Sequence, residues 1–368
     1  ERDQLLSDHM GDSFLLTDLA HPDAAADDIA GAGPFDAVVA PDDQGVLAAA
    51  LAAERLGLAH NPPAAVAATR NKVALRRALR GVVRQPVYQV LEDGTDAGLV
   101  AGELGFPVVL KPLSRSGSQG VIRADDGDGA RAAASRIRRI LAVCGANPSE
   151  PLLVERFVPG PEIAVEAVLV DGDLRVLAIF DKPDPLDGPY FEETIYVAPS
   201  RLHPEVLDAA EALVSEACAA LGLETGPVHA ELRIDAGRPV LIEVAARPIG
   251  GRCGQALHFG LLGTSLEALL LRAALDRPLA GLRLTEAVGA LMLPIPRTGV
   301  LEEVRGLEAA ARIPNVTGVE LSMPIGSRVQ ALPDGDRYLG FAFAAADDAA
   351  EVETALRSVM GTVEVVVA

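Results

Sequence analysis

The sequence predicts a mixed α/β protein with more than one structural unit. Strand-like and helix-like apolar segments alternate along most of the 368 residues, a pattern typical of α/β and α+β architectures. Hydrophobic residues make up 49% of the chain, yet aromatics make up only 4% and Trp is absent. Ala, Val, Leu and Ile must therefore fill the core, and a chain of this length favours two or three units.

Residues 1–69 predict an N-terminal doubly wound α/β domain, with the option that its first strand is missing. Phe14–Leu16 and Ala37–Val39 have the pattern of short buried strands. The Ala- and Leu-rich segment 45–56 predicts a helix that ends at Gly57, because glycine readily adopts the left-handed conformation that closes helices.

Residues 70–282 predict the main domain, with a small lid subdomain at about 110–156. Residues 182–202 hold four prolines, and a long loop of this kind is typically functional. Residues 283–368 predict a small α+β cap integrated with the main domain. The elements expected are helices at 73–79, 130–143, 204–221 and 349–360, and strands at 86–90, 106–110, 121–122, 152–154, 163–170, 175–180, 227–234, 239–244 and 363–367.

Charge and composition exclude several classes of function. The net charge is 32 − 52 = −20, and a chain this acidic repels the phosphate backbone of nucleic acids. The three cysteines form no CxxC pair, which argues against a zinc site or a disulfide framework and favours a reducing cytosol. We see no apolar run of membrane-spanning length, and residues 1–12 are too polar for a signal peptide. We expect a cytoplasmic protein that binds neither nucleic acid nor membrane, with homodimerisation open.

The segment 229–243 predicts a β-hairpin that brings two carboxylates together. Its turn lies at Ala236-Gly237, and apolar and polar residues alternate along its first strand. With a three-residue turn, Glu231 falls opposite Glu243 on the polar face. Facing carboxylates repel each other unless a cation lies between them, and a hard divalent ion with oxygen ligands meets that need. An exposed strand pair in an acidic protein remains the alternative interpretation.

Anion-binding residues follow this hairpin directly and also precede it. Arg247 can hold a phosphate or carboxylate through two parallel hydrogen bonds, and Gly250 and Gly251 let backbone N–H groups approach an anion. Upstream, Lys111 ends an apolar strand just before the Ser- and Gly-rich loop 114–120. Such a loop can fold over phosphates, although the chain contains no Walker A motif.

Taken in order, these segments resemble the ATP-grasp superfamily over roughly residues 36–368. The segments are NK at 71–72, FPVVLKP at 106–112, the Ser/Gly loop, LLVERFVPGPE at 152–162, HAELR at 229–233 and IEVAARPIGG at 242–251. The last two are most similar to carboxylate–amine ligases that join amino acids, the L-amino acid ligase branch. The resemblance implies an ATP-grasp fold and an ATP-dependent ligase that activates a carboxylate as an acyl phosphate and joins it to an amine.

The resemblance also implies the roles of individual residues. Lys72 and Lys111 would contact the α- and β-phosphates, and Ser116, Gly117, Ser118 and Gly120 would belong to the flap over the β- and γ-phosphates. Glu155, Arg156 and Val158 would form the adenine hinge, with Glu162 on the ribose. Glu231 and Glu243 would bind one or two Mg²⁺ ions, for which Mn²⁺ can substitute. Arg247, Gly250 and Gly251 would hold the transferring phosphate.

One residue departs from the superfamily pattern and bears on the alternatives. Many ATP-grasp enzymes place an Asn metal ligand two residues after the second Glu, where this chain has Ala245. This favours the amino acid ligase branch over a carboxylase or purine-pathway ligase that uses bicarbonate or formate. A nucleotide-binding module without turnover is the third interpretation. His229 is expected to be structural rather than a base, and Glu192, Glu193 and Tyr196 are candidates to meet the incoming amine.

Overall fold

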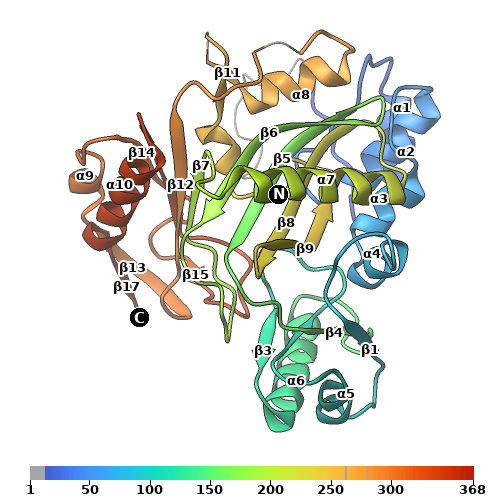
Figure 1. The fold of residues 1–368 in the computed structure, drawn as a ribbon, viewed down its shortest axis with the longest axis vertical. Coiled ribbons are helices and arrows are strands. Elements are labelled where there is room, and N and C mark those ends of the chain that lie inside the picture. The colour runs from blue at the N-terminus through green and yellow to red at the C-terminus, as the bar shows by residue number, and fades with distance from the viewer. Residues whose placement is uncertain (1–12, 262, 280) are drawn as a thin grey trace.

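A computed structural model describes residues 13–261, 263–279 and 281–368 (Figure 1). Its centre is an eight-stranded antiparallel sheet in the order β14-β16-β12-β7-β6-β5-β8-β9. This sheet and the smaller ones around it confirm the expected ATP-grasp architecture. The central strands are β5 (Glu162–Val170), β6 (Asp173–Lys182), β7 (Ile195–Ala198), β8 (Gly226–Asp235), β9 (Arg238–Ala245), β12 (Ala287–Leu293), β14 (Val316–Leu321) and β16 (Gly340–Ala346).

Helices cover both faces of this sheet. The helix α7 (Pro204–Leu221) packs on one face through Ala210, Val214 and Ala217, which share a core cluster with strands β5 and β8. It begins at Pro204, where a proline costs no hydrogen bond, and ends at Gly222 in the left-handed conformation, as its sequence predicts. The helix α8 (Leu266–Ala274) and the 3₁₀ turn η2 (Cys253–Ala256) pack on the other face.

The hairpin β8–β9 pairs the two carboxylates, but not through the expected three-residue turn. Asp235 pairs with Arg238 across a two-residue turn, in which Ala236 and Gly237 both have positive φ. That turn alone would leave Glu231 one residue out of register with Glu243. A β-bulge between Glu231 and Leu232 shifts the pairing by one residue and places Glu231 opposite Glu243.

The lid subdomain is larger than expected at its N-terminal end. Its four-stranded sheet has the order β1-β4-β2-β3, from β1 (Tyr88–Leu91), β2 (Val108–Lys111), β3 (Ile122–Ala124) and β4 (Leu152–Arg156). The helices α5 (Ala97–Leu104) and α6 (Gly127–Val143) pack on it around one apolar cluster. Because β1 and α5 belong to this sheet and core, the lid begins well before the expected boundary at 110. Figure 1 shows it as a lobe below the central sheet.

The C-terminal residues extend the main sheet and add a layer outside it. Strands β12, β14 and β16 pair within the central sheet. The helix α10 (Ala349–Thr362), capped by Asp348, packs against β12 and β16. The remaining elements are α9 (Leu307–Ala310), the three-stranded sheet β13 (Gly299–Arg305), β15 (Arg328–Val329) and β17 (Glu364–Val367), and the pair β10 (His258–Phe259) and β11 (Thr264–Ser265).

The N-terminal segment differs most from its prediction. The described residues 13–69 form helices α1 (Pro22–Gly31), α2 (Val46–Leu56) and α3 (Pro63–Thr69) and no strand. The strands expected at 14–16 and 37–39 are wrong, and Leu16 is 89% exposed. A three-residue apolar run forms a strand only beside another strand that shares its hydrogen bonds, and none lies there in the described residues. Residues 1–12, where no signal peptide was expected, lie outside the described residues.

Two further findings concern the rest of the chain. The segment 182–202, expected to be a loop throughout, contains β7, so Tyr196 lies buried on a strand of the central sheet. The prolines of this segment indicated a loop, but Pro183 and Pro199 lie just after the ends of β6 and β7 and therefore interrupt neither strand. Among the described helices, none combines the length and apolar character required to cross a membrane.

Candidate active site

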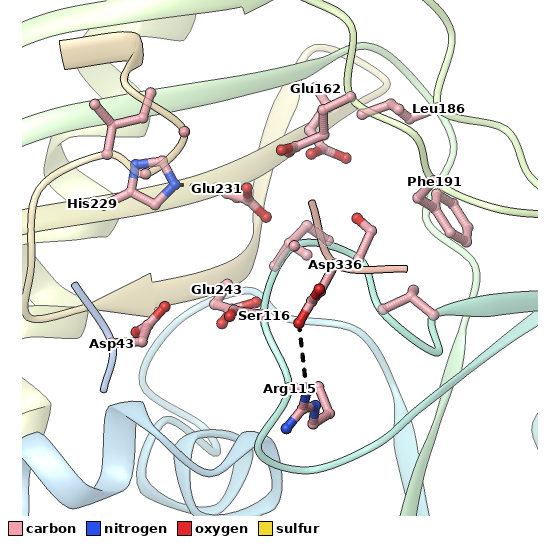
Figure 2. Close-up of a pocket in the computed structure, with 18 of the residues that line it drawn as sticks. Asp43, Arg115, Ser116, Glu162, Leu186, Phe191, His229, Glu231, Glu243 and Asp336 are labelled. Atoms are coloured by element: carbon pink, nitrogen blue, oxygen red, sulfur yellow. Dashed lines mark ion pairs between the residues drawn. The ribbon is translucent and has the colours of Figure 1, made fainter. Parts of the chain in front are cut away.

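The predicted site residues gather around one cavity of about 520 Å³ between the hairpin, the lid, the N-terminal loop 42–44 and the C-terminal segment (Figure 2). This size is ordinary for small-molecule sites. Two predicted residues do not line it. Gly120 faces Pro112 and Ile137 within the lid, and Glu192 is absent from the lining although its neighbour Glu193 belongs to it. The predicted residues that line it are Lys72, Lys111, Ser116, Gly117, Ser118, Glu155, Arg156, Val158, Glu162, Glu193, Tyr196, His229, Glu231, Glu243, Arg247, Gly250 and Gly251.

A cluster with excess negative charge occupies the centre of the site. The Nζ of Lys182 lies 2.7 Å from Glu162, 2.5 Å from Glu193 and 3.0 Å from Glu231. Burial would raise the pKa of Glu231, but Lys182 and His229 hold it well below the usual range. Burial raises the pKa of Glu193 despite Lys182. One ammonium thus faces three carboxylates.

These carboxylates fit a divalent metal ion. Oxygens of Glu162, Glu193 and Glu231 all lie within 4.8 Å of one another, and Glu243 stands opposite Glu231 in the hairpin. Such all-oxygen donor sets are typical of Mg²⁺ sites. Ala245, where an Asn ligand is common in the superfamily, is buried opposite His229 and supplies no donor. Glu162 and Glu193 instead offer further carboxylate oxygens close to Glu231.

A second cluster, at the lid side, has excess positive charge. Glu155 is fully buried and accepts from Arg76 Nε at 2.5 Å and from Lys111 Nζ at 2.8 Å. Burial would raise the pKa of Glu155, but the two cations lower it to about 2. The carboxylate is therefore held by the protein's own cations, whereas Arg76 Nη1 has no hydrogen-bond partner.

Arg247 is held at the far side of the cavity by the N-terminal loop. Its Nη2 lies 3.0 Å from Asp43 Oδ2, and Asp43 also contacts Arg70 at 3.3 Å. Burial opposes the charge of Arg247, but Asp43 raises the pKa of that guanidinium. Asp43 thus fixes the direction of the arginine that follows Glu243 in the chain.

A buried histidine–glutamate pair supports the turn that follows the hairpin. His229 Nδ1 contacts Glu166, and Glu166 Oε2 accepts from the backbone N–H of Ile249 at 2.9 Å. Burial would lower the pKa of His229, but Glu166 raises it to about 9. His229 Nε2 lies 3.6 Å from Glu231, so the ring contacts carboxylates through both of its nitrogens.

Five functional residues of the site were missed from the sequence: Asp43, Arg76, Glu166, Lys182 and Arg233. Lys182 carried a usable signal, because it ends an apolar strand and precedes Pro183, just as Lys111 precedes Pro112. Arg233 stood on the polar face of the hairpin; it now bonds Glu162 at 3.0 Å and stacks over the Phe157 ring. Arg76, Asp43 and Glu166 carried no distinctive pattern.

Comparisons with known proteins agree with this geometry. The sequence profile of the ATP-grasp domain matches residues 104–256, and that of the L-amino acid ligase C-terminal domain 2 matches residues 291–368. The crystal structure of the L-amino acid ligase from Bacillus licheniformis superimposes with a TM-score of 0.77 at 28% identity, over 94% of this chain and 85% of that one. The chain therefore contains an ATP-grasp domain and an L-amino acid ligase C-terminal domain.

Curated relatives of this ATP-grasp chain include amide-forming ligases. Dapdiamide A synthase of Enterobacter agglomerans is 31% identical over 50% of this chain and 44% of its own length. An uncharacterized protein of Sinorhizobium fredii, y4rH, is 29% identical over 80% of this chain and 60% of its own length. The chain therefore spans less than two thirds of these curated relatives, and its own activity is a matter of proposal.

Proposed function

We propose that this ATP-grasp chain is an ATP-dependent, ADP-forming carboxylate–amine ligase that joins an amino acid or a related carboxylate to an amine. The observation that carries the proposal is the placement of Glu231 and Glu243 opposite each other, in one cavity with Lys72, Lys111 and Arg247. This arrangement offers carboxylates for a metal and separate cations for phosphates. The similarity to dapdiamide A synthase and to the L-amino acid ligase of Bacillus licheniformis, with the match to the L-amino acid ligase C-terminal domain, supports the same class of reaction.

The charge of each cluster suggests what it binds. The carboxylates Glu231 and Glu243, with Glu162 or Glu193 beside them, would hold Mg²⁺, which supplies neutralisation of the phosphate charge. Lys111, near the excess positive charge of the lid cluster, and Lys72, whose Nζ donates to the carbonyl of Arg115 in the Ser/Gly loop at 2.8 Å, would bind phosphate oxygens. The proposal includes one or two Mg²⁺ ions, adenine contacts from Glu155, Arg156 and Val158, and a ribose contact from Glu162.

The reaction asks for positioning more than for covalent catalysis by side chains. A carboxylate oxygen of the first substrate forms a bond to the γ-phosphorus of ATP, and the bond to ADP breaks, which gives an acyl phosphate. The neutral amine then forms the amide bond, phosphate leaves, and the amine loses one proton. Arg247, fixed by Asp43, would stabilise the charge on the transferring group. Glu193, contacted by the hydroxyls of Tyr196 and Tyr338, is the group placed to receive the amine.

A matrix of amino acid and amine pairs tests this function directly. We expect ADP release that depends on Mg²⁺ and on both substrates, together with an amide product detected by its mass. ADP release with bicarbonate alone would instead support a carboxylase. Nucleotide binding without turnover under every pair would support a binding module.

Three expectations about context remain predictions. A cytoplasmic location agrees with the free state of Cys144, Cys218 and Cys253. Homodimerisation and the exclusion of nucleic acid are likewise part of the proposal. Size-exclusion chromatography with light scattering would test homodimerisation. An electrophoretic mobility shift assay with duplex DNA would test the exclusion of nucleic acid.

A further inference from the structure

The Ser/Gly loop 114–120 is docked on the C-terminal segment 333–336. The backbone N–H of Gly120 donates to the carbonyl of Pro333 at 2.9 Å. Gln119, which is buried, donates through Nε2 to the carbonyl of Asp334 at 2.8 Å and accepts from Arg115 Nε at 2.7 Å. The loop is therefore tied by its backbone and by a buried amide to a segment more than two hundred residues away in sequence.

Charged side chains reinforce this contact from both sides. Arg136, on the lid helix α6, places Nη2 2.8 Å from Asp334 Oδ2. Arg115, inside the loop, lies 3.7 Å from Asp336, as Figure 2 shows across the mouth of the cavity. Gly117 lies so close to the carbonyl of Asp336 that an added Cβ would stand 3.2 Å from it. The interface thus has matched charge and a close fit of backbone to backbone.

The same C-terminal segment reaches the acceptor side of the cavity. Tyr338, two residues after Asp336, donates to Glu193 at 3.3 Å. The segment therefore contacts the loop that would cover the phosphates and the carboxylate that would receive the amine. A displacement of residues 333–338 would disturb both ends of the site together.

We propose that Gln119 and Asp334 are positioning residues that hold the Ser/Gly loop 114–120 closed on the C-terminal segment 333–336 and thereby keep water from the acyl phosphate. This inference rests on the proposed ligase function. If the loop opens before the amine reacts, water forms the bond to the acyl carbon, phosphate leaves and the carboxylate is regenerated. ATP is then consumed without amide formation. Closure of a site commonly serves to exclude water in this way.

Amide hydrogen exchange of the Gly120 N–H measures the docking itself. In Asp334→Ala, which leaves every backbone carbonyl in place, we expect exchange at Gly120 to be about tenfold faster or more than in the parent chain. The matched control is Asp93→Ala, since Asp93 pairs with Arg138 on the same helix α6 at 3.2 Å but away from the interface. The double variant Arg136→Asp with Asp334→Arg should restore slow exchange.

A second measurement reads the consequence for the reaction. With a substrate pair that the parent chain joins, Asp334→Ala and Gln119→Ala should raise the ratio of ADP to amide from about one to about three or more, whereas Asp93→Ala should leave it unchanged. A fold-wide destabilisation would not alter that ratio. The inference is overturned by unchanged Gly120 exchange in Asp334→Ala or by a ratio that stays at one. Because the exchange experiment needs no turnover, failure to join any pair would count against the ligase function alone.

Discussion

The two buried charge clusters of the site have opposite imbalances. On the lid side, Arg76 and Lys111 share the single carboxylate of Glu155. In the central sheet, two cations serve three carboxylates: Lys182 contacts Glu162, Glu193 and Glu231, and Arg233 also contacts Glu162. Neither cluster is neutral by itself, and buried charge without a partner is costly. The difference teaches that the lid side is prepared for an anion and the sheet side for a cation, which is the polarity that a metal-bound nucleotide requires.

The largest expected effect is the loss of the carboxylates that would bind metal. Glu231→Gln and Glu243→Gln should each lower ADP release by about 100-fold or more, because the charge that develops on the phosphates loses its neutralisation. Steady-state release of ADP at saturating Mg²⁺ measures this. Glu303→Gln, at an exposed position of β13, is the control that should keep full activity. Turnover by both hairpin variants at the parent rate would contradict the metal assignment.

Replacing the lysine of each cluster sharpens the comparison through stability. Lys182→Met removes the cation that Glu162, Glu193 and Glu231 share. Glu162 keeps Arg233 and Glu231 keeps its contact with His229, so the substitution should cost about 3–5 kcal/mol in the free energy of unfolding, chiefly through Glu193. Lys111→Met leaves Arg76 on Glu155 and should cost only about 1–2 kcal/mol. Urea titration measures both. Millimolar Mg²⁺ should restore part of the lost stability of Lys182→Met and none of that of Lys111→Met. A larger stability loss in Lys111→Met than in Lys182→Met would contradict the distinction between the clusters.

The pH dependence of the lid cluster follows from the low pKa of Glu155, about 2. A carboxyl whose folded pKa is depressed stabilises the fold above its ordinary value of 4.5, and this contribution is lost as pH falls toward 2. The free energy of unfolding of the parent chain should therefore exceed that of Glu155→Gln by about 3 kcal/mol at pH 7. The gap should narrow steadily below pH 4.5. A gap that stays constant between pH 6 and pH 3 would show that the carboxylate is not the titrating group.

The smallest expected effect concerns Asp43, which pairs with Arg247 and with Arg70. Asp43→Asn keeps the shape and removes the charge, so we expect kcat to fall about tenfold while KM for ATP changes little. Initial rates over a range of ATP concentrations separate the two constants. The control Asp42→Asn changes the neighbouring residue, for which the described residues show no ion pair to Arg247. A rise in KM without a fall in kcat would assign Asp43 to binding instead.

Sequence reasoning predicted the site better than it predicted the N-terminal unit. The pairing of Glu231 with Glu243 followed from strand alternation and turn residues, whereas the phosphate roles of Lys72 and Lys111 came from the resemblance to the ATP-grasp superfamily. The expected three-residue turn was wrong, because a two-residue turn and a β-bulge reach the same pairing, and bulges leave no clear pattern in one sequence. Strands at 14–16 and 37–39 were wrong because strand formation depends on neighbours that local pattern does not specify.

Partners distant in sequence account for what could not be predicted. Arg76 meets Glu155 across 79 residues, and Asp43 meets Arg247 across 204. Each of these residues, taken locally, has the pattern of an ordinary helix or loop position. Lys182 is the exception, because the strand–Lys–Pro arrangement that drew attention to Lys111 is repeated there. The arrangement of an apolar strand, a lysine and a proline thus occurs at both Lys111 and Lys182.

The central claim is that a carboxylate is activated by phosphoryl transfer. The most direct measurement uses a substrate carboxylate labelled with ¹⁸O, in a pair that the chain joins, with mass analysis of the released phosphate. The account predicts one labelled oxygen in the phosphate for each amide formed, since that oxygen bridges the acyl carbon and phosphorus before the amine displaces it. Unlabelled phosphate, accompanied by amide formation, would contradict the account.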